Sequence, residues 1–527
     1  MRNKTSFLIV FAIICSGAFV SCTKDLNQKP TNGLTASEVY NSPLGYKLAF
    51  AKLYGSFALT GNDGSGSGDI QGIDAGTSDF FRLYWYVQEL STDEAVISWG
   101  DAGIQDFHNM NWSSNNPFLT GLYYRSMYQI TLVNDFIRQS SQSNLDARGI
   151  KGDDAATIKT FVAEARFLRA YQYSVLMDLF GNPPFATDSL QIGEIPKQIN
   201  RKDLFNYVES ELKAIEPDLK APRTNEYGRA DQAADWALLA RIYLNAEVYT
   251  GTARFNDAVT YSKKVIDAGY SLVPDYRWLM LADNDLNTDE FILTINYDGI
   301  HTQNYGGTTF LTHAPVGGNM VPAKFGISGG WAGARTTKNL PDLFPDFTGD
   351  KDTRAEFFTD GQNLEINDIT VFNDGLGITK FKNVTRSGAN GSSLDYSDID
   401  MPIFRLPEMY LTYAEATLRG GDGDKSLALQ YVNKLRERAY GETNSGDISA
   451  NDLTLNFILD ERGRELYWEG YRRTDLIRFG KFTSNSYVWP WKGGVKSGTG
   501  VQDYRKLYPL PVKDVSANPN LVQNPGY

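Results

Sequence analysis

Apolar residues recur at helical spacing along several long stretches of this 527-residue chain. In the first stretch, Val39, Leu44, Leu48 and Leu53 follow this spacing, which is typical of a helix with one buried face. We therefore predict helices over residues 36–57, 118–138, 155–180, 203–218, 232–247, 409–418 and 426–438. Gly181 follows the third stretch, and glycine just past a helix is a common stop signal.

Part of this pattern fits a known repeat. Trp236, Leu239 and Tyr243, followed by Ala258 on a second helical stretch, match a tetratricopeptide repeat with an enlarged turn at Tyr249–Asn256. The other stretches pair in the same way and give about four helix pairs. The predicted fold class is therefore mostly α, a tetratricopeptide-like α-solenoid.

Residues 283–400 interrupt the helical pattern. They are rich in Gly, Asn and Thr and contain only short β-prone runs such as Phe291–Tyr297. Long loops on a rigid frame commonly carry binding residues, so we expect this loop-rich insertion to form the ligand face. The predicted organisation is one domain over residues 36–527, with a helical frame at about 36–282 and 401–480, the insertion at about 283–400, and a C-terminal loop segment at 481–527.

The start of the chain has the form of an export signal. Basic residues precede the apolar run Phe7–Ile14, which is too short to span a bilayer. Cleavage before Cys22 would remove Cys15 and leave one cysteine with no intramolecular partner. We predict a lipoprotein signal peptide at residues 1–21, lipidation of Cys22, and a polar tether at 22–35. The alternative is a plain signal peptide followed by an incidental cysteine.

Charge and composition limit the partners and the chemistry. Without residues 1–21, the chain has 49 basic and 63 acidic residues, a net charge of −14. This argues against nucleic acid or an anionic lipid surface as the main partner. No later apolar segment is long enough to span a bilayer, so we expect membrane attachment through the lipid anchor only. The sequence has 3 His and no H-E-x-x-H.

A glutamate-rich segment near the C-terminus suggests two interpretations. Glutamates recur every four residues from Glu461 to Glu469, in a segment that we expect to be one helix up to Arg478. Paired carboxylates perform glycoside hydrolysis, but arginines such as Arg464 lower the pKa of a nearby carboxyl and make it a poor general acid. We therefore predict a structural ion-pair network. Its expected buried members are Arg464, Glu465 and Asp475.

An acidic loop resembles a calcium ligand set. Asp283, Asp285, Asn287 and Asp289 alternate as oxygen ligands do in a calcium-binding loop. The segment lacks the glycine and the final glutamate of an EF-hand. We expect no required cofactor, and calcium binding and a solvated acidic loop remain alternatives for this segment.

Several motifs carry a family resemblance. Asp460–Gly480 has the sequence DERGRELYWEGYRRTDLIRFG, and the chain ends with NPNLVQNPGY at Asn518–Tyr527. A third motif, AEARFLRAYQY at Ala163–Tyr173, leads to DLFG at Asp178–Gly181. These motifs resemble the SusD/RagB family of outer-membrane, surface-exposed nutrient-binding lipoproteins. The resemblance covers essentially the whole chain.

Further motifs are most similar to the starch-binding founder of that family. They lie at Phe80–Arg82, Glu89–Glu94, Asp298–Gly307 and Asn485–Gly494. The resemblance implies a non-catalytic, lipid-anchored protein on the outer face of the outer membrane. It would bind starch or malto-oligosaccharides and deliver them to a SusC-like TonB-dependent transporter. The resemblance also suggests calcium in the acidic loop at 283–289.

The resemblance also implies which residues bind the ligand. The predicted set is Arg82, Trp99, Asp101, Tyr305 and Trp331. The three aromatic residues would form an arc for a curved oligosaccharide, and Arg82 would bond sugar hydroxyls. The founder's asparagine partner falls at Ala102, so we expect Asp101 to replace its contact. Small residues flank each ring, which we expect to give a sugar access, although ordinary core packing is the simpler alternative.

Other functions remain open from the sequence. A glycoside hydrolase would need an acid and a nucleophile held apart in a cleft, and no such pair stands out. The same binding role for another glycan is a second alternative. A lid for peptide import, a role of some family members, is a third, and it would bind proteins rather than polysaccharides.

Overall fold

The computed structural model describes residues 35–70, 73–191, 193–441 and 443–527. The predicted signal peptide, Cys22 and all of the tether except Thr35 lie outside these residues. The fold is mostly helical, with 46% helix and few strands, which confirms the prediction of a mostly α protein. Among the described helices, none combines the length and apolar character needed to cross a bilayer.

The helices predicted beyond residue 100 are present. The long ones are α6 (Pro117–Gln139), α8 (Gly152–Leu179), α9 (Arg201–Ile215), α10 (Gln232–Leu244), α12 (Phe255–Ile266), α14 (Leu406–Leu418) and α15 (Lys425–Ala439). Polar side chains fix several of their starts. Asn116 accepts hydrogen bonds from the first backbone N–H groups of α6, and Asp231 does the same for α10.

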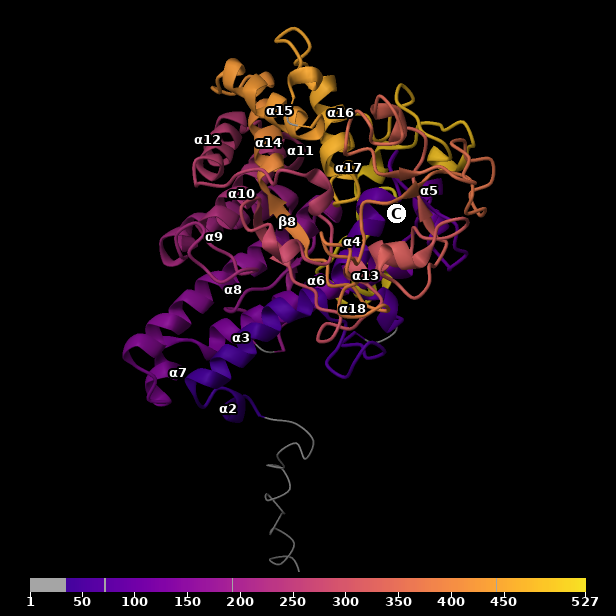
Figure 1. Cartoon of the computed structure of the whole chain (residues 1–527). Helices are drawn as coiled ribbons and strands as arrows, with labels where there is room; N and C mark the ends of the chain where they lie inside the picture. Colours follow the sequence, from indigo (N-terminus) through magenta and orange to yellow (C-terminus); the bar gives the residue numbers. More distant parts are fainter. Residues whose placement is uncertain (1–34, 71–72, 192, 442) are drawn as a thin grey trace, which may run out of the picture.

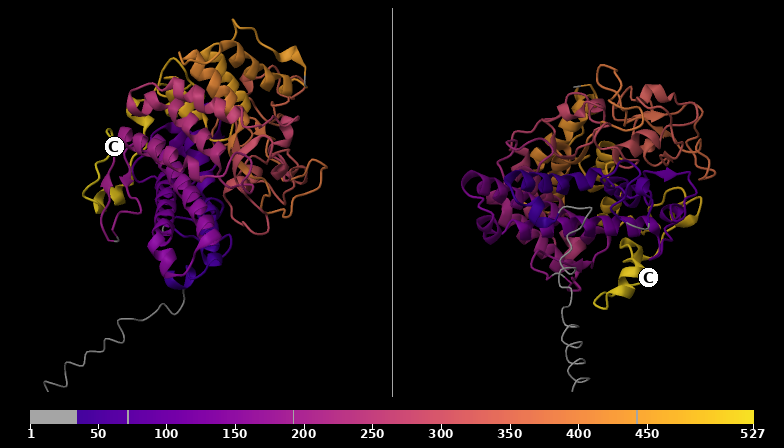
Figure 2. Two further views of the ribbon diagram at one scale, coloured as in Figure 1. Left: turned by 90° about the vertical axis from the view of Figure 1, so that its left-hand side faces the viewer. Right: turned by 90° about the horizontal axis from the view of Figure 1, so that it is seen from below.

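These helices pack mainly on their neighbours in the chain. The helix α6 packs on α8 and α8 on α9, while α10 packs on α12 and α14 on α15. Figure 1 shows the stack rising from α8 to α15, and Figure 2 shows it from two further sides. The helix α12 also packs on α14, so the stack continues across the insertion. Packing between successive neighbours is what a solenoid of helix pairs requires.

The remaining elements are mostly short, apart from α3, which has 16 residues. The helices are α2 (Ala36–Val39), α3 (Pro43–Ala58), α4 (Phe80–Glu89), α5 (Gln105–Asn109), α7 (Gln142–Ala147), α11 (Ala246–Thr250), α13 (Gly307–His313), α16 (Leu455–Leu466), α17 (Arg472–Arg478) and α18 (Val512–Ala517). The strands are β1 (Val96–Ile97), β2 (Pro184–Phe185), β3 (Lys197–Gln198), β4 (Phe291–Ile295), β5 (Ala334–Arg335), β6 (Phe357–Phe358), β7 (Gly377–Ile378) and β8 (Met401–Arg405). All of the sheets have two strands and are antiparallel within the described residues: β1–β5, β2–β3, β4–β8 and β6–β7.

A buried ladder closes the base of the insertion. Strand β4 pairs with β8 so that Phe291 faces Arg405 and Ile295 faces Met401. All residues of both strands are buried. The chain therefore leaves the helical frame and returns to it at one place. Between these strands the described residues are mainly loops, with α13 as an α-helix that the sequence pattern did not predict.

Two predicted continuous helices are broken. The stretch at 36–57 divides into α2 and α3, because Ser42 caps a new helix and Pro43 occupies its first turn. The segment at 461–478 ends one helix at Leu466, before α17 begins. Between these helices Trp468 and Gly470 have φ of 64° and 87°, a left-handed conformation that cannot continue an α-helix.

The glutamates of this broken segment still converge on buried cations. Glu465 lies 2.6 Å from Arg405 Nη1, and Glu469 lies 2.7 Å from both Arg405 Nε and Lys380 Nζ. Arg354 Nη1 lies 2.8 Å from Glu461. All of these carboxylates are fully buried. Buried ion pairs are also present for the predicted members Arg464, Glu465 and Asp475, which confirms the structural network.

Candidate functional site

A short strand pair brings two of the predicted rings together. Trp99 follows β1 and Trp331 precedes β5, the partner strand. Ser98 extends the pairing, because its N–H donates to the Gly333 carbonyl at 3.0 Å and its hydroxyl donates to the Ala332 carbonyl at 2.8 Å. The two indole centroids are 6.3 Å apart with the rings tilted by 46°. Trp99 Nε1 also donates to the Trp331 carbonyl at 3.2 Å.

Tyr305 joins these tryptophans from the turn before α13. Its ring centroid lies 6.4 Å from that of Trp331, with a tilt of 56°, and the residue is 43% exposed. Asn304 fixes the turn by donating from its side chain to the Ala58 carbonyl. Residues from separate parts of the chain thus form one surface, which we call the ring face: Trp99, Trp331 and Tyr305.

Asp79 connects the two helices that carry the site. Its Oδ1 accepts from the Arg82 N–H at 2.9 Å, which caps α4, and from the Gly307 N–H at 2.7 Å, at the start of α13. Burial raises the pKa of Asp79 to about 6, although these backbone bonds lower it in part. Asp79 therefore holds the start of Arg82's helix beside the segment that presents Tyr305.

Arg82 lies against the ring face and has no carboxylate partner among the described residues. Its Nε donates to the Tyr86 hydroxyl at 2.8 Å, and its Nη1 donates to the carbonyls of Gly76 at 2.9 Å and Tyr305 at 2.8 Å. Nη2 has no hydrogen-bond partner within the described part of the chain. The guanidinium carbon lies 4.9–5.9 Å from the ring centroids of Tyr86, Trp99, Phe310 and Trp331, a cation–π arrangement.

Asp101 is exposed on the loop that follows Trp99. Burial raises the pKa of Tyr86, and the negative charge of Asp101 raises it further. Ala102 beside it is also exposed. The structure therefore brings all five predicted ligand residues into one region: Arg82, Trp99, Asp101, Tyr305 and Trp331.

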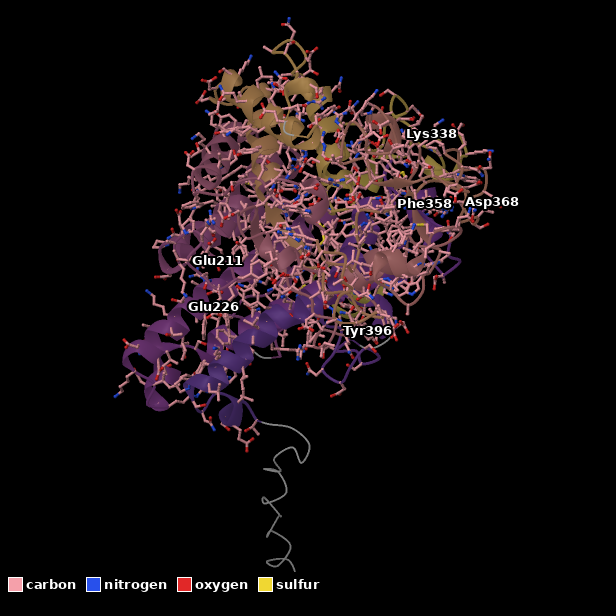
Figure 3. The ribbon with its side chains drawn as sticks, viewed as in Figure 1. Glu211, Glu226, Lys338, Phe358, Asp368 and Tyr396 are labelled. Atoms are coloured by element: carbon pink, nitrogen blue, oxygen red, sulfur yellow. The ribbon has the colours of Figure 1, made fainter. Side chains whose placement is uncertain are left out.

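Tyr396 extends the ring face and was not predicted. Its ring centroid lies 5.6 Å from that of Tyr305. Its hydroxyl donates to Ser65 Oγ at 2.9 Å and to the Tyr305 hydroxyl at 3.4 Å. Figure 3 labels this residue on the loop-rich side of the molecule. The only sequence signal was an isolated aromatic residue in the polar run 392–398.

The glycines near the rings have two different roles. At Gly100 and Gly329 no atom lies within 4 Å of the position that an added Cβ would occupy, which agrees with the expected access to the rings. At Gly333, however, a Cβ would lie 2.3 Å from the Trp99 ring, and at Gly330 it would lie 2.1 Å from the Val316 carbonyl. These two glycines allow the protein to pack closely on itself.

The acidic loop at 283–289 contacts cationic side chains of the protein. Asp283 accepts from the Arg386 N–H at 3.1 Å, and Asn287 accepts from the Arg386 side chain. Asp289 lies 2.5 Å from Arg223 Nη2. No group of at least three His, Cys, Asp or Glu side chains is placed to hold a metal ion within the described residues. Calcium in this loop stays a prediction.

The buried charges of the helical frame do not form a hydrolytic pair. Burial raises the pKa of Glu465, but Arg438, Arg405 and Arg354 together lower it to about 2. A carboxyl with this pKa is ionised at neutral pH and cannot donate a proton.

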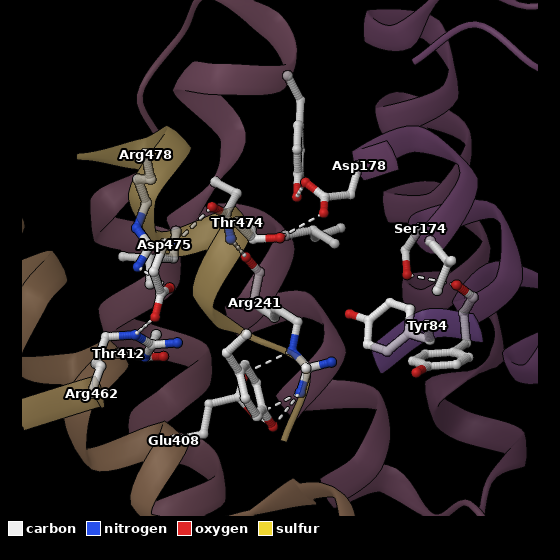
Figure 4. Close-up of a pocket in the computed structure, with 18 residues that line it drawn as sticks. Tyr84, Ser174, Asp178, Arg241, Glu408, Thr412, Arg462, Thr474, Asp475 and Arg478 are labelled. Atoms are coloured by element: carbon white, nitrogen blue, oxygen red, sulfur yellow. Dashed lines mark hydrogen bonds and ion pairs between the residues drawn. The ribbon is translucent and has the colours of Figure 1, made fainter. Parts of the chain in front are cut away.

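Figure 4 shows a cavity between the helices that is lined by ion pairs. Arg241 lies 2.7 Å from Glu408, and Arg462 lies 2.6 Å from Asp475. Its volume of about 40 Å³ has room for only a few water molecules.

This mostly helical protein thus has a surface of aromatic rings formed by Trp99, Trp331 and Tyr305. The chain belongs to the SusD family, whose glycan-binding members are non-catalytic. The SusD family model matches residues 348–527. The starch-binding protein SusD of Bacteroides thetaiotaomicron is 35% identical, over 99% of both chains. SusD-like protein P25 of Formosa agariphila is 26% identical, over 74% of this chain and 77% of that protein.

Solved structures share the fold. Surface glycan-binding protein A from Bacteroides fluxus has a TM-score of 0.69 at 21% identity, covering 92% of this chain and 100% of that one. Surface glycan-binding protein A from Bacteroides thetaiotaomicron, in complex with laminarihexaose, has a TM-score of 0.68 at 23% identity, covering 91% and 98%. These similarities show that the fold is shared.

Proposed function

We propose that this protein binds starch and malto-oligosaccharides on the ring face without cleaving them. The observation that carries the proposal is the assembly of Trp99, Trp331 and Tyr305 around Arg82, in a chain 35% identical to a starch-binding protein. These rings come from loops far apart in the sequence, so their meeting depends on the fold.

The chemistry of the ring face suits a sugar. Pyranose rings have an apolar C–H face and polar edges, and aromatic rings pack against the first. Arg82 Nη2 has no partner within the described residues and supplies a charged donor for a hydroxyl. Asp101 is exposed on the loop after Trp99, and its carboxylate supplies a hydrogen-bond acceptor. The side chain of the neighbouring Ala102 cannot form a hydrogen bond. Donors and acceptors therefore lie beside the stacking surface.

The shape of the ring face favours a curved ligand. The rings of Trp99 and Tyr305 are tilted by 46° and 56° to that of Trp331, so the surface is not flat. An α-linked glucan coils and presents a curved surface, whereas a cellulose chain is extended and flat. This tilt supports an α-glucan as the ligand.

The same proposal covers location and delivery. Lipidation of Cys22, which lies outside the described residues, would anchor the protein at the outer membrane, with the ring face outward. Bound oligosaccharide would then pass to a SusC-like TonB-dependent transporter. Cell fractionation of a Cys22→Ala variant tests the anchor, and retention of the variant in the outer membrane of cells without the transporter would contradict it.

A second candidate ligand is a glucan of the kind held by a structural neighbour. Surface glycan-binding protein A from Bacteroides thetaiotaomicron shares the fold and was solved with laminarihexaose. This ligand has less support, because the sequence identity to that protein is 23%, against 35% to the starch-binding relative.

Calorimetry with purified mature protein distinguishes these ligands. Maltoheptaose, laminarihexaose and cellohexaose are titrated in parallel, and each sugar is recovered afterwards to test for cleavage. The proposal expects binding of maltoheptaose, at least tenfold weaker binding of the two β-linked sugars, and no shortened products. A preference for laminarihexaose would agree with the proposed site but would contradict starch as its ligand. No binding of any of them would reject glucan binding.

A further inference from the structure

An imidazole ring stacks on the central ring of the ring face. The His313 and Trp331 ring centroids are 4.9 Å apart and the rings are tilted by only 29°. Neither of the other rings of the ring face lies as close to Trp331 or as nearly parallel, since Trp99 is at 6.3 Å and Tyr305 at 6.4 Å. His313 therefore makes the closest ring contact of Trp331 within the described residues.

His313 is itself held firmly. It is the last residue of α13 and is 3% exposed. Its Nδ1 lies 2.9 Å from the Thr309 carbonyl and 3.0 Å from Thr312 Oγ1. Its own carbonyl accepts from the Trp331 N–H at 2.8 Å. The same residue thus constrains both the main chain and the side chain of Trp331, while its burial keeps it away from a bound sugar.

The main chain beside Trp331 adopts a conformation that needs such support. Ala332 has a φ of 48°, and the left-handed region is uncommon for residues other than glycine. Its N–H donates to the Val316 carbonyl at 2.9 Å, and the Gly333 N–H donates to the Ala314 carbonyl at 2.8 Å. Surrounding contacts therefore impose the conformation of this segment, as they commonly do where strain is kept at functional sites.

We propose that His313 is a positioning residue for glycan binding: its flat ring sets the tilt of Trp331, and this tilt determines how well the ring face fits a curved glucan. The inference rests on the proposed function for its effect on affinity. A residue that merely fills the core would be replaceable by any side chain of similar volume. A positioning ring is replaceable only by another flat ring.

Two variants separate these roles. His313→Phe keeps a flat ring beside Trp331, and His313→Leu does not, while both lose the same Nδ1 hydrogen bonds. We expect His313→Leu to weaken maltoheptaose binding by about fivefold, the magnitude of one lost ring–ring contact, and His313→Phe to remain within about twofold. His313→Gln is a second ring-free variant, for use if the leucine variant does not fold. Equal losses in the Phe and ring-free variants would overturn the proposal.

A double-mutant cycle tests whether His313 acts through Trp331. In a Trp331→Ala background, His313→Leu should produce no further loss of affinity. The same fivefold loss in that background would contradict a positioning role.

A spectroscopic measurement does not depend on the ligand. The contribution of Trp331 to the near-ultraviolet circular dichroism is isolated as the difference between the wild type and Trp331→Phe. This contribution should change in His313→Leu and should remain as in the wild type in His313→Phe. If no glucan binds to the wild type, the proposed function fails and this spectrum still decides the positioning. Identical difference spectra in all variants would reject it.

Discussion

Two buried arginines in this protein have opposite surroundings. Arg405 is fully buried and bonds three carboxylates, those of Glu290, Glu465 and Glu469. Arg82 is also buried, yet within the described residues it contacts a hydroxyl, two backbone carbonyls and aromatic rings, and no carboxylate. The first arginine lies in the helical frame, and the second lies at the ring face.

Under the proposed function, the difference separates a structural charge from one that serves a ligand. A buried ion loses its hydration, and carboxylates replace that hydration for Arg405. For Arg82 the replacement is incomplete, because aromatic rings and carbonyls stabilise the cation while Nη2 has no partner within the described residues. That Nη2 of Arg82 is free in the described part of the chain agrees with the proposal that a polar ligand completes its hydrogen bonding.

The largest expected effect is in the frame. Glu465 forms ion pairs with both Arg405 and Arg438, and both pairs are lost when Glu465 is replaced with Ala. Removing one partner of a buried ion pair costs about 3–5 kcal/mol. Chemical denaturation should show this loss in the free energy of unfolding. Maltoheptaose affinity per folded molecule, measured by calorimetry, should stay unchanged. Glu437→Ala, an exposed glutamate on α15, is the matched control and should change stability by less than about 0.5 kcal/mol.

The pH dependence of this effect follows from the sign of the pKa shift. The pKa of Glu465 in the folded protein is lowered to about 2 from 4.5, because three arginines outweigh the effect of burial. Its contribution to stability is therefore present above pH 4.5 and is lost as the pH falls towards 2. The gap in stability between the wild type and Glu465→Ala should narrow over this range. A constant gap would contradict the assignment of an ionised, paired carboxylate.

The second effect concerns the ring face. Replacing Trp99 and Trp331 together with Ala removes two stacking surfaces, each worth on the order of 1 kcal/mol beyond the burial of its area. Maltoheptaose binding should weaken by about a hundredfold, with a cooperative unfolding transition retained. Trp491→Ala removes a half-buried indole whose Nε1 donates to the Ile366 carbonyl, and it should leave affinity unchanged. Unchanged affinity in the folded double variant would show that the glycan binds elsewhere.

Arg82→Met tests the comparison directly. The substitution keeps much of the side-chain volume and leaves no opposing carboxylate unpaired, so stability should fall far less than in Glu465→Ala. Binding should weaken by about tenfold, as expected for the loss of a charged hydrogen bond to a hydroxyl. A loss of stability as large as that of Glu465→Ala, with affinity retained, would make Arg82 a structural residue like Arg405.

The sequence predicted the parts that depend on local pattern. Apolar spacing located α6 and α8 closely, whereas the three rings of the ring face were predicted from the family resemblance. It did not predict the break at Trp468 and Gly470, because the helical pattern of charges continues through a turn set by left-handed backbone. His313 and Tyr396 were also missed, since their roles depend on ring contacts with residues distant in the chain.

The smallest expected effect defines where the ring face ends. Tyr396 lies beyond Tyr305, with its ring centroid 5.6 Å from the neighbouring ring, so only a longer oligosaccharide should reach it. Tyr396→Ala should weaken maltoheptaose binding by about threefold to fivefold, in keeping with one peripheral stacking contact, and leave maltotriose binding unchanged. Tyr396→Phe keeps the ring but loses the hydroxyl bonds to Ser65 and Tyr305, and it should bind both sugars like the wild type. If Tyr396→Ala weakens both sugars equally, Tyr396 supports Tyr305 and contributes no contact of its own, and the ring face then ends at Tyr305.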